Sequence, residues 1–393
     1  MMAIARADAV DVAVVGGGPA GTAAALTLLK YSSLQVAVIE RSSYDRWRIG
    51  ESLSPGAADL LRYLGAWDAF IAQGHLPSHG TSAAWGNPEI VARDFLFGGR
   101  GSGWHLDRRR FDQMLAGLVS AHGGLVMTNA VVEREARDKE SWRLFVRRGA
   151  ERNSCELRAR FVIDASGKEA VFARRNGARR NVGDWLVGTV SFYSFPGAKP
   201  SDSFTVVEAD SLGWWYSALL PECRMAVAFM SDADIIRRYR LRQSGPWLDL
   251  LASSCHTRQR IEGGVLGSGP LVCPAYSQIL EPIAEDGWVA AGEAAAGFDP
   301  LSSMGIGYAL LSGIESARAV HNRLTADGRQ MSCYTASVGR HYAAHRTRQL
   351  QYYSMEQRWP DSPFWARRQI LAPNPTLPAG LSVTPSRRRS VQQ

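Results

Sequence analysis

Three glycines and an acidic residue near the N-terminus have the types and the spacing to hold a dinucleotide. In the G-x-G-x-x-G pattern of Gly16, Gly18 and Gly21, the first glycine permits a tight turn, the second lets backbone approach a pyrophosphate, and the third lets a helix pack closely on a sheet. Glu40 follows about 20 residues later, where a carboxylate can accept hydrogen bonds from ribose hydroxyls. The alternative is a glycine-rich turn with a purely structural role.

The residues around these glycines predict the strand, helix and strand that such a turn requires. Residues 12–15 are a short apolar run typical of a buried parallel strand, and residues 35–39 supply the next strand. Residues 19–29 between them predict a helix whose N-terminal N–H groups point at the phosphates. The sequence therefore predicts a nucleotide-binding α/β unit at the N-terminus.

The composition indicates a globular chain with two joined domains. Its 393 residues exceed the ~250 to 300 at which single cores stop growing. No long apolar run occurs and the N-terminus is too short and mixed for a secretion signal, so we expect no membrane span and a cytoplasmic location. Scattered cysteines without C-x-x-C spacing suit a reducing compartment, and no metal site is predicted. They are Cys155, Cys223, Cys255, Cys273 and Cys333.

The net charge of +8 comes largely from local arginine clusters, at residues 108–110, 367–368 and 387–389. No basic stripe is interleaved with aromatic residues, as a nucleic-acid groove would require, so we expect no nucleic-acid partner. An arginine-rich, solvated surface is the simpler interpretation, and an anionic peptide or protein partner stays open.

Periodic patterns place the remaining elements. The loop after Glu40 is polar where a bound nucleotide would pass, with Arg46, Arg48 and Glu51. Alternating stretches within 184–279 predict an antiparallel sheet, of the kind that covers a substrate site. Further strands are predicted at 104–106, at 288–291 and, as an antiparallel meander ending at Asp164, at 130–135, 143–147 and 157–162; helices are predicted at 56–64, 108–121, 305–324 and 342–368.

Separated stretches of the chain resemble one family, the FAD-dependent monooxygenases of the glutathione-reductase-like fold, and more closely the branch that contains flavin-dependent halogenases. The N-terminal glycines and Glu40 match its ADP site, Arg108 opens an R-x-x-F-D-x-x-L helix, and Asp164 lies in VIDASGKEAVFARR. The return segment AAGEAAAGFDPLSSMGIG carries the last match. The resemblance implies FAD as cofactor, bound by Gly16, Gly18, Gly21, Glu40, Arg41, Arg48, Arg108, Asp164, Glu293, Pro300, Gly305 and Ile306.

The resemblance also assigns roles within the return segment. Glu293 is expected at the ribityl hydroxyls, and Pro300, Gly305 and Ile306 beside the isoalloxazine. A helix beginning near Gly305 would aim its N-terminus at flavin N1 and O2, where negative charge collects on reduction. The alternative for this segment is a simple glycine-rich loop between a strand and a helix.

Two departures from the family pattern bear on the cofactor. The family usually has Asp where this chain has Glu293, and Asp164-Ala165-Ser166-Gly167 replaces the plain Asp-Gly of NADPH-using hydroxylases. No second Rossmann fingerprint is present, so nicotinamide is not expected to be held permanently. A separate flavin reductase, or NAD(P)H, is the expected electron source.

The family resemblance leaves hydroxylation and halogenation to be weighed. Halogenases need a lysine near a halide tunnel and a W-x-W-x-I-P stretch; here no lysine occurs between Lys30 and Lys139, and the nearest aromatic counterpart is GWWYSALLP at 213–221. Direct oxygen transfer from a flavin C4a-hydroperoxide formed with molecular oxygen is therefore the expected chemistry. A free indole or phenol as the substrate of a hydroxylase or halogenase remains the alternative.

Four stretches resemble more closely the flavoprotein maturases that hydroxylate a tryptophan of a partner polypeptide during biogenesis of tryptophan-derived quinone cofactors. They lie at 74–86, 103–112, 213–221 and 352–369. This resemblance implies a peptide or protein substrate bearing tryptophan. A non-catalytic, flavin-binding docking protein that uses the arginine-rich tail is the alternative of another class.

Several residues on the substrate side are candidates for work on an indole. His75, His79 and His105 can move protons near neutral pH, and Glu356 can orient an indole N–H or pair with a nearby arginine. Glu356 and Arg358 are expected on different sides of a helix. Of these, His79, His105 and Glu356 are the predicted catalytic residues. The predicted lining of an apolar slot, unless these residues are ordinary core, is Trp85, Trp104, Trp214, Trp215 and Tyr216.

The predicted fold class is α/β (α+β), with a glutathione-reductase-like, FAD-binding Rossmann domain, an inserted antiparallel-sheet substrate domain and a C-terminal helical segment. The predicted bounds are 1–183 and 281–328 for the FAD-binding domain (with 70–105 contributing to the substrate side), 184–280 for the substrate domain, 329–372 for the helical segment and 373–393 for a disordered tail or surface arm.

Overall fold

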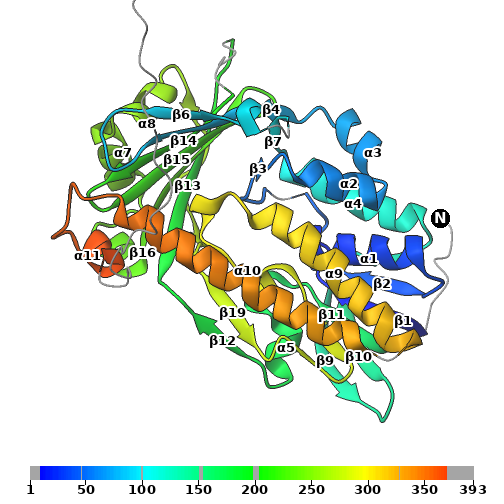
Figure 1. Cartoon of the computed structure of the whole chain (residues 1–393). Coiled ribbons are helices and arrows are strands. Elements are labelled where there is room, and N and C mark those ends of the chain that lie inside the picture. Colours follow the sequence, from blue (N-terminus) through cyan, green and yellow to red (C-terminus); the bar gives the residue numbers. More distant parts are fainter. Residues whose placement is uncertain are drawn as a thin grey trace, which may run out of the picture.

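The computed structural model describes residues 9–45, 47–98, 101–149, 154–197, 203–326 and 328–369. Two large sheets dominate it, one at the end of the molecule that holds α1 and β2 and the other at the opposite end, with the long helix α10 (Arg329–Ser354) running between them (Figure 1). Arg46 and the predicted tail 373–393 lie outside the described residues.

The first sheet is the predicted nucleotide-binding sheet. Its centre is β1 (Ala9–Val15), paired in parallel with β2 (Val36–Ile39) on one side and β11 (Cys155–Asp164) on the other. β8 (Leu125–Met127) and β21 (Trp288–Ala290) continue it, also in parallel. The carboxyl ends of these strands therefore share one edge of the sheet, the edge at which open α/β sheets bind ligands.

The antiparallel meander predicted to end at Asp164 is confirmed, and its last strand has further partners. The strands at 130–135, 143–147 and 157–162 do pair antiparallel, as β9 (Ala130–Arg137), β10 (Trp142–Arg148) and β11. β11 also pairs in parallel with β1 and β21, so the last strand of the meander is at the same time a strand of the central sheet. Its last four residues, 161–164, are all buried, which suits a strand covered on both faces.

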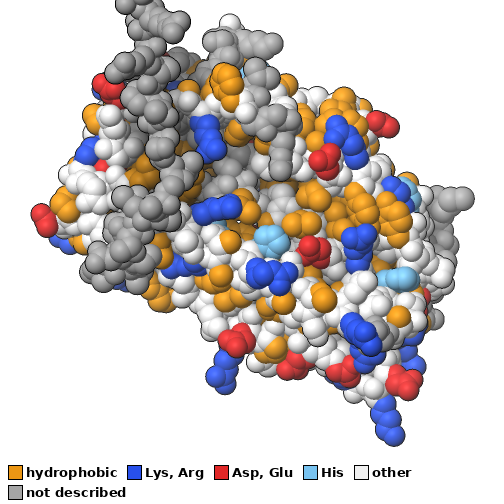
Figure 2. Space-filling view, viewed as in Figure 1, with side chains coloured by type: hydrophobic (Ala, Val, Ile, Leu, Met, Phe, Trp, Pro, Cys, Tyr) orange, Lys and Arg blue, Asp and Glu red, His pale blue; other side chains and the backbone are white. Residues whose placement is uncertain are grey.

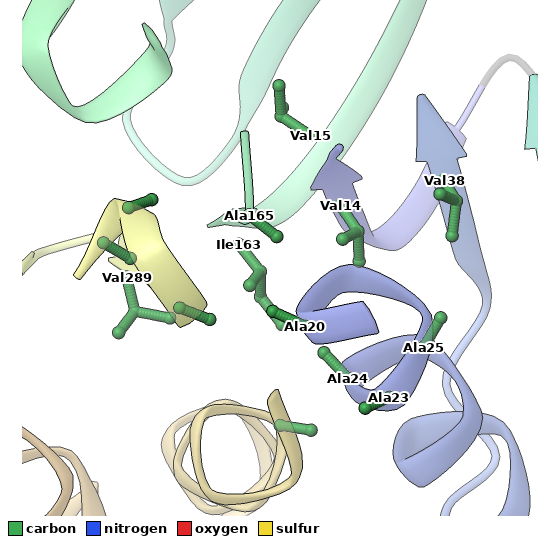
Figure 3. Close-up of a cluster of buried hydrophobic side chains, with 14 of the residues drawn as sticks. Val14, Val15, Ala20, Ala23, Ala24, Ala25, Val38, Ile163, Ala165 and Val289 are labelled. Atoms are coloured by element: carbon green, nitrogen blue, oxygen red, sulfur yellow. The ribbon is translucent and has the colours of Figure 1, made fainter. Parts of the chain in front are cut away.

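Helices α1 (Pro19–Tyr31) and α9 (Gly305–Thr325) cover the first sheet. Figure 3 shows Ala20, Ala23 and Ala24 of α1 between the strand residues and the neighbouring helix. A Cβ at Gly313 would overlap the carbonyl oxygen of Ala20, so the two helices touch backbone to backbone. The small residues of α1 thus bring α9 close to the glycine turn.

The second sheet contains the predicted antiparallel strands and four further strands. β13 (Leu186–Ser194), β16 (Arg224–Asp232), β15 (Gly213–Leu220) and β14 (Thr205–Asp210) pair antiparallel in that order. β5 (Gly80–Ala84) then joins β14 in parallel, so part of 70–105 lies on this side as expected. The remaining strands are β6 (Val91–Asp94), β17 (Val265–Leu266) and β18 (Leu271–Pro274).

Short elements connect the two sheets. β3 (Ser52–Leu53), β7 (Gly103–His105) and β4 (Leu76–Ser78) form one small sheet, and β12 (Arg179–Val182), β19 (Gln278–Glu281) and β22 (Ala296–Gly297) form another. The other helices are α2 (Ala57–Leu64), α3 (Trp67–Ala72), α4 (Arg108–Ala121), α5 (Val171–Arg175), α6 (Ala233–Arg238), α7 (Ser244–Ser253) and α8 (His256–Arg260), and β20 (Ala284–Glu285) edges the first sheet. α4 has the predicted bounds.

The C-terminal helical sequence is two helices, α10 and α11 (Pro363–Gln369), with a break at 355–362. Pro360 and Pro363 explain the break, because proline disfavours helix in the residue before it and suits a first helical turn. The expectation that Glu356 and Arg358 face different sides of a helix is therefore wrong. Helix α11 packs against the second sheet, and Trp365 Nε1 donates a hydrogen bond to Asp210 O at the end of β14, at 2.8 Å.

In the part of the chain that is described, no helix is both long enough and apolar enough to cross a membrane.

Candidate flavin site and its surroundings

The glycine turn leaves room for a phosphate in front of α1. Gly16 has φ +107°, and a Cβ there would overlap the carbonyl oxygen of Ala165, while a Cβ at Gly21 would overlap that of Gly16. Both positions therefore exclude a side chain. At Gly18 the nearest atom to such a Cβ is Arg48 Nη1 at 3.9 Å. Gly18 caps α1 without a side-chain hydrogen bond, so the first N–H groups of this 13-residue helix are left for an anion.

Glu40 and Arg48 form an ion pair beside this turn. Arg48 Nη2 donates to Glu40 Oε1 at 2.7 Å, and Gly17 N donates to Oε2 at 2.7 Å. Burial opposes ionisation of Glu40, but the hydrogen bonds from Ser42 and the charge of Arg48 outweigh it and hold the pKa of Glu40 below its usual value. Glu40 is thus an ionised, fixed group next to the turn. Its contact with a ribose stays a prediction.

Arg108 anchors the loop that carries Arg48. It donates from Nε and Nη2 to Asp112 and from Nη1 to the carbonyl oxygens of Ile49 and Gly50, at 2.9–3.1 Å. Arg48 Nη1 also reaches Asp112, at 3.1 Å. Arg41, at the end of β2, is exposed. Of the three predicted cofactor arginines, Arg48 alone lies directly against the glycine turn, and cofactor contacts by Arg41 and Arg108 stay predictions.

Asp164 ends β11 at the same edge of the sheet. Its carboxylate accepts hydrogen bonds from Ser166 N and Oγ at 3.0 and 2.6 Å and from Ala173 N at 2.8 Å. The side chain is fully buried and ties β11 to α5. In this arrangement the carboxylate organises the backbone behind the site, and direct contact with FAD stays a prediction.

Glu293 lies just after β21 and is held by a lysine that the sequence did not single out. Lys168 Nζ is 3.0 Å from Glu293 Oε1 and donates to Tyr276 O at 3.1 Å. The lysine side chain is 10% exposed and the glutamate side chain 43%, so the carboxylate is the accessible member of the pair. A hydroxyl-rich ribityl chain is a suitable partner for such a carboxylate.

The return loop is fixed to α10 through Asp299. The carboxylate accepts from Leu301 N at 2.9 Å, Gln349 Nε2 at 2.6 Å and Tyr353 OH at 2.9 Å, and Asp299 N donates to His345 Nε2 at 3.1 Å. Burial, reinforced by the charge of Asp184, raises the pKa of Asp299 to about 6. This cluster positions the residues that follow it in the chain.

Pro300, Gly305 and Ile306 follow this cluster at the start of α9. Pro300 begins a 3₁₀ turn (Pro300–Ser302), and the 21-residue helix α9 starts at Gly305 without a side-chain cap. A Cβ at Gly305 would meet no atom within 4 Å. An uncapped helix N-terminus next to open space suits the flavin ring, which gains negative charge on reduction. Together with the glycine turn, these residues fit FAD.

The name apolar slot is kept here for four half-buried side chains, Ile49, Phe192, Tyr216 and Leu301, and a cavity between them stays a prediction. These four side chains pack against a buried cluster that includes Trp214. Ile49 and Leu301 come from the segments that flank the flavin site, whereas Phe192 and Tyr216 come from β13 and β15. Apolar side chains of the second sheet and of the predicted cofactor loops therefore pack against the same cluster.

The five predicted slot aromatics do not share one surface, which corrects the prediction. Trp85 and Trp214 pack together on the slot side of the second sheet, as does Tyr216. Trp215 points to the opposite face and contacts Phe229 and Trp247, because neighbouring residues of a strand alternate faces. Trp104 packs against Trp67 and Phe70 in the core of the first sheet.

The three candidate histidines have different surroundings. His105 is fully buried, with Nε2 2.9 Å from Thr205 Oγ1. His79 is exposed and lies 2.8 Å from Ser203 Oγ through Nδ1. His75 Nδ1 accepts from Asp107 N, and burial lowers the pKa of His75 to about 4, so it is neutral near pH 7. Catalytic roles for His79 and His105 stay predictions.

Glu356 is buried in the break between α10 and α11, and its carboxylate accepts hydrogen bonds from other residues of the chain. Oε2 accepts from Gly86 N at 2.8 Å and from Arg358 Nη2 at 2.6 Å, and Oε1 accepts from Arg358 Nε at 2.9 Å. Burial opposes its ionisation, yet the Arg358 hydrogen bonds hold the pKa of Glu356 below its usual value. Its geometry favours pairing with arginine, the second of the two roles considered from the sequence, and a catalytic role stays a prediction.

A hollow of ≈ 850 Å³ lies away from these residues, lined by the last turns of α1 and by α9 and α10. Its lining includes Thr27 and Tyr31, at the other end of α1 from Gly18, so it is not the flavin site.

On the face drawn in Figure 2, Lys and Arg side chains are scattered among side chains of other kinds and form no continuous basic patch there.

Sequence reasoning missed Lys168, Asp299 and the position of Glu51. Asp299 lies one residue before Pro300, inside the return segment already assigned to the cofactor. Its place in that segment is the sequence feature that could have identified it. Lys168 is 125 positions from Glu293 in number, and no local pattern links the two. Glu51 was noted only as a polar loop residue, whereas the structure buries it.

Comparisons with known proteins agree with a flavin site. The family model of the FAD binding domain matches residues 9–215. LodB of Marinomonas mediterranea, which is named as an FAD-dependent oxidoreductase, is 31% identical over 371 residues, covering 93% of this chain and 98% of LodB. FAD is therefore the cofactor and the chain is an enzyme of the oxidoreductase class.

Two solved structures share the fold. CmlS, a flavin-dependent halogenase, matches with a TM-score of 0.80 at 25% identity, covering 91% of this chain and 67% of CmlS. QhpG, a peptidyl tryptophan dihydroxylase essential for tryptophylquinone cofactor biogenesis, matches with a TM-score of 0.72 at 22% identity, covering 92% of this chain and 78% of QhpG. The chain belongs to the FAD-dependent oxidoreductases of the flavin-dependent halogenase-like family.

Proposed function

We propose that this protein is an FAD-dependent monooxygenase that hydroxylates an aromatic ring, namely the side chain of a tryptophan in a peptide or protein. The apolar slot carries the proposal, because it faces the loops that fit the flavin and is lined by half-buried apolar side chains. The fold shared with QhpG, which acts on peptidyl tryptophan, supports the choice of substrate.

The overall reaction is Ar–H + O₂ + 2 H⁺ + 2 e⁻ → Ar–OH + H₂O, with the electrons supplied by a separate flavin reductase or by NAD(P)H. Bound FAD supplies the activation of oxygen. The chain binds the dinucleotide through the glycine turn, holds the return loop through Asp299, and keeps water from the ring with the slot residues Ile49, Phe192 and Leu301.

The test is direct. Purified protein with FAD, a flavin reductase, NADH and isotopically labelled O₂ is mixed with tryptophan-containing peptides, among them peptides encoded beside its gene. We expect a mass gain of one or two labelled oxygen atoms on tryptophan. A matched peptide with phenylalanine in place of tryptophan should gain none. A protein that binds FAD and consumes oxygen but labels no aromatic ring in any peptide or free indole would contradict the proposal.

Halogenation of a free indole or phenol is the second candidate, and the similarity to CmlS favours it. Against it stands the pairing of Lys168, a lysine beside the return loop, whose ammonium is bound to Glu293. Adding bromide to the same assay separates the two chemistries, since a bromine isotope pattern in the product identifies a halogenase.

A docking protein without catalysis is the third possibility. It would bind a partner with no gain of oxygen in either molecule. Deleting residues after 373 should abolish that binding, whereas the monooxygenase should retain its activity on a free indole or a short peptide after the same deletion.

A further inference from the structure

Glu51 is a buried carboxylate at the border of the apolar slot. Its side chain is 3% exposed, and it lies between Ile49, which packs against the slot cluster, and Ser52, whose Oγ is 2.8 Å from Tyr216 OH. The same segment also touches the start of α9, since a Cβ at Gly307 would lie 3.5 Å from Ser54 Oγ. Glu51 therefore stands where the second sheet meets the flavin site.

The carboxylate of Glu51 has few partners for a buried charge. Oε2 accepts from Gly50 N at 2.6 Å, and among the residues that the structure describes no side chain donates a hydrogen bond to it. The nearby guanidinium of Arg108 donates to Asp112 and to the carbonyl oxygens of Ile49 and Gly50 instead. Buried carboxylates normally accept several hydrogen bonds, so Glu51 keeps capacity for another donor.

The charge of Glu51 affects the pKa of two residues of the second sheet. Burial is the main cause that raises the pKa of Tyr216, and the charge of Glu51 raises it further. The same two causes raise the pKa of Cys273 to about 11. The carboxylate therefore lies near Tyr216 on β15 and Cys273 on β18, and also near Arg108; burial, only partly offset by the hydrogen bond from Gly50 N and the charge of Arg108, raises the pKa of Glu51 above its usual value.

We propose that Glu51 accepts a hydrogen bond from the ring N–H of the substrate, so that the slot selects nitrogen heteroaromatic rings such as indole over rings without an N–H donor. This inference rests on the proposed function for the position of the substrate. An N–H donor would satisfy the carboxylate, whereas an apolar ring of the same shape would bury it unpaired. Glu51 is thus a specificity-determining residue and not the group that activates oxygen.

Ligand binding without turnover tests this directly. FAD-loaded, oxidised protein is titrated with indole and with benzothiophene, which has the same shape but no N–H, and binding is followed by calorimetry and by the perturbation of the flavin spectrum. We expect indole to bind about tenfold or more tightly, as a hydrogen bond to a charged group provides. Glu51→Gln should reduce this preference to about twofold or less, whereas Glu51→Asp should retain part of it.

The controls separate a local from a global effect. Glu89→Gln, an exposed glutamate in the loop before β6, should leave the preference unchanged. FAD affinity should change less than about threefold in both Glu51 variants. Loss of FAD binding in both would assign the carboxylate to the fold and overturn the inference.

The outcomes also distinguish this inference from the proposed function. Equal binding of indole and benzothiophene to the wild type, or a preference that persists in Glu51→Gln, overturns the role of Glu51 and leaves monooxygenation standing. Failure of both rings and of tryptophan peptides to bind removes the aromatic substrate, and with it both proposals.

Discussion

Gly16 and Gly21 are the residues at which the flavin site least tolerates a side chain. Each has a neighbouring carbonyl oxygen where a Cβ would be, and Gly16 also has φ +107°. A methyl group at either position must move the backbone of the turn that faces the pyrophosphate. A Cβ at Gly18 would meet only Arg48 Nη1, at 3.9 Å, so there is space beside this glycine for a phosphate.

Gly16→Ala and Gly21→Ala should each weaken FAD binding by about 100-fold or more, as measured by quenching of flavin fluorescence, because the turn can no longer approach the pyrophosphate. Gly117→Ala is the matched control. Gly117 lies inside α4 with no atom within 4 Å of the added carbon, so this change should leave FAD affinity intact and stabilise the fold by up to ~1 kcal/mol. Normal affinity in the first two variants would contradict the assignment of the turn.

Asp299 predicts a pH dependence of stability. Its pKa is raised from 3.8 to about 6, so folding favours the protonated form, and the stability contributed by this group is present below pH 3.8 and lost as pH rises through about 6. The difference in unfolding free energy between wild type and Asp299→Asn should therefore fall by about 2 kcal/mol between pH 4 and pH 7. Denaturant unfolding at several pH values measures it, and a difference independent of pH would contradict the assignment.

At the scale of elements, the break between α10 and α11 decides what Glu356 does. Helix α10 carries three residues that hold the return loop. In the segment after it, Glu356 binds Gly86 N, just past the end of β5, and Arg358 binds Ala84 O of β5. The cofactor loop and the second sheet are thus positioned by one continuous stretch of chain. A change in the break should loosen both the sheet and the loop.

Glu356→Gln should destabilise the protein by about 3 kcal/mol, because Arg358 loses a buried partner. Arg358→Met should have an effect of similar size, since it removes the other half of the pair. The measurement is denaturant unfolding, together with the rate of product formation per folded, FAD-loaded molecule. If Glu356→Gln leaves stability unchanged and abolishes product formation, the residue is catalytic and the structural account is wrong.

At the scale of the whole molecule, segments that are distant in the sequence make up the predicted FAD site. The turn after β1, the loop around Arg48 and the return segment before α9 meet at one edge of the first sheet. The second sheet contributes one side of the apolar slot. Binding of the cofactor should therefore stabilise the folded chain as a unit and not only the N-terminal strand and helix.

Removing FAD should lower the Tm, and adding it back should raise the unfolding free energy by about 2.7 kcal/mol at 100 times Kd. Thermal unfolding across a range of FAD concentrations measures this. Gly16→Ala should abolish the concentration dependence, whereas Gly117→Ala should preserve it. An apoprotein as stable as the FAD-loaded form would mean that the cofactor does not bridge these segments.

The amino-acid sequence by itself determined the nucleotide half of the site and most of the elements. The glycine spacing, the apolar runs of β1 and β2 and the pattern of α4 are local features, because each depends on residues a few positions apart. The return segment could also be predicted, since its glycines and Pro300 stand together. The double role of β11 could not, because pairing partners are set by strands more than 100 positions away.

Only the tertiary structure decided which candidate side chains lie on the side of the predicted flavin site and which lie in the core. Trp214 and Trp215 are neighbours in the sequence and lie on opposite faces of a sheet, and Lys168 meets Glu293 across a long stretch of chain. Glu51 gained its significance only when folding buried it beside Tyr216 with little to satisfy its charge. Residue type and spacing are local and were enough to predict the cofactor. Burial and long-range pairing are properties of the folded chain, so the surroundings of the candidate substrate-side residues depend on tertiary packing.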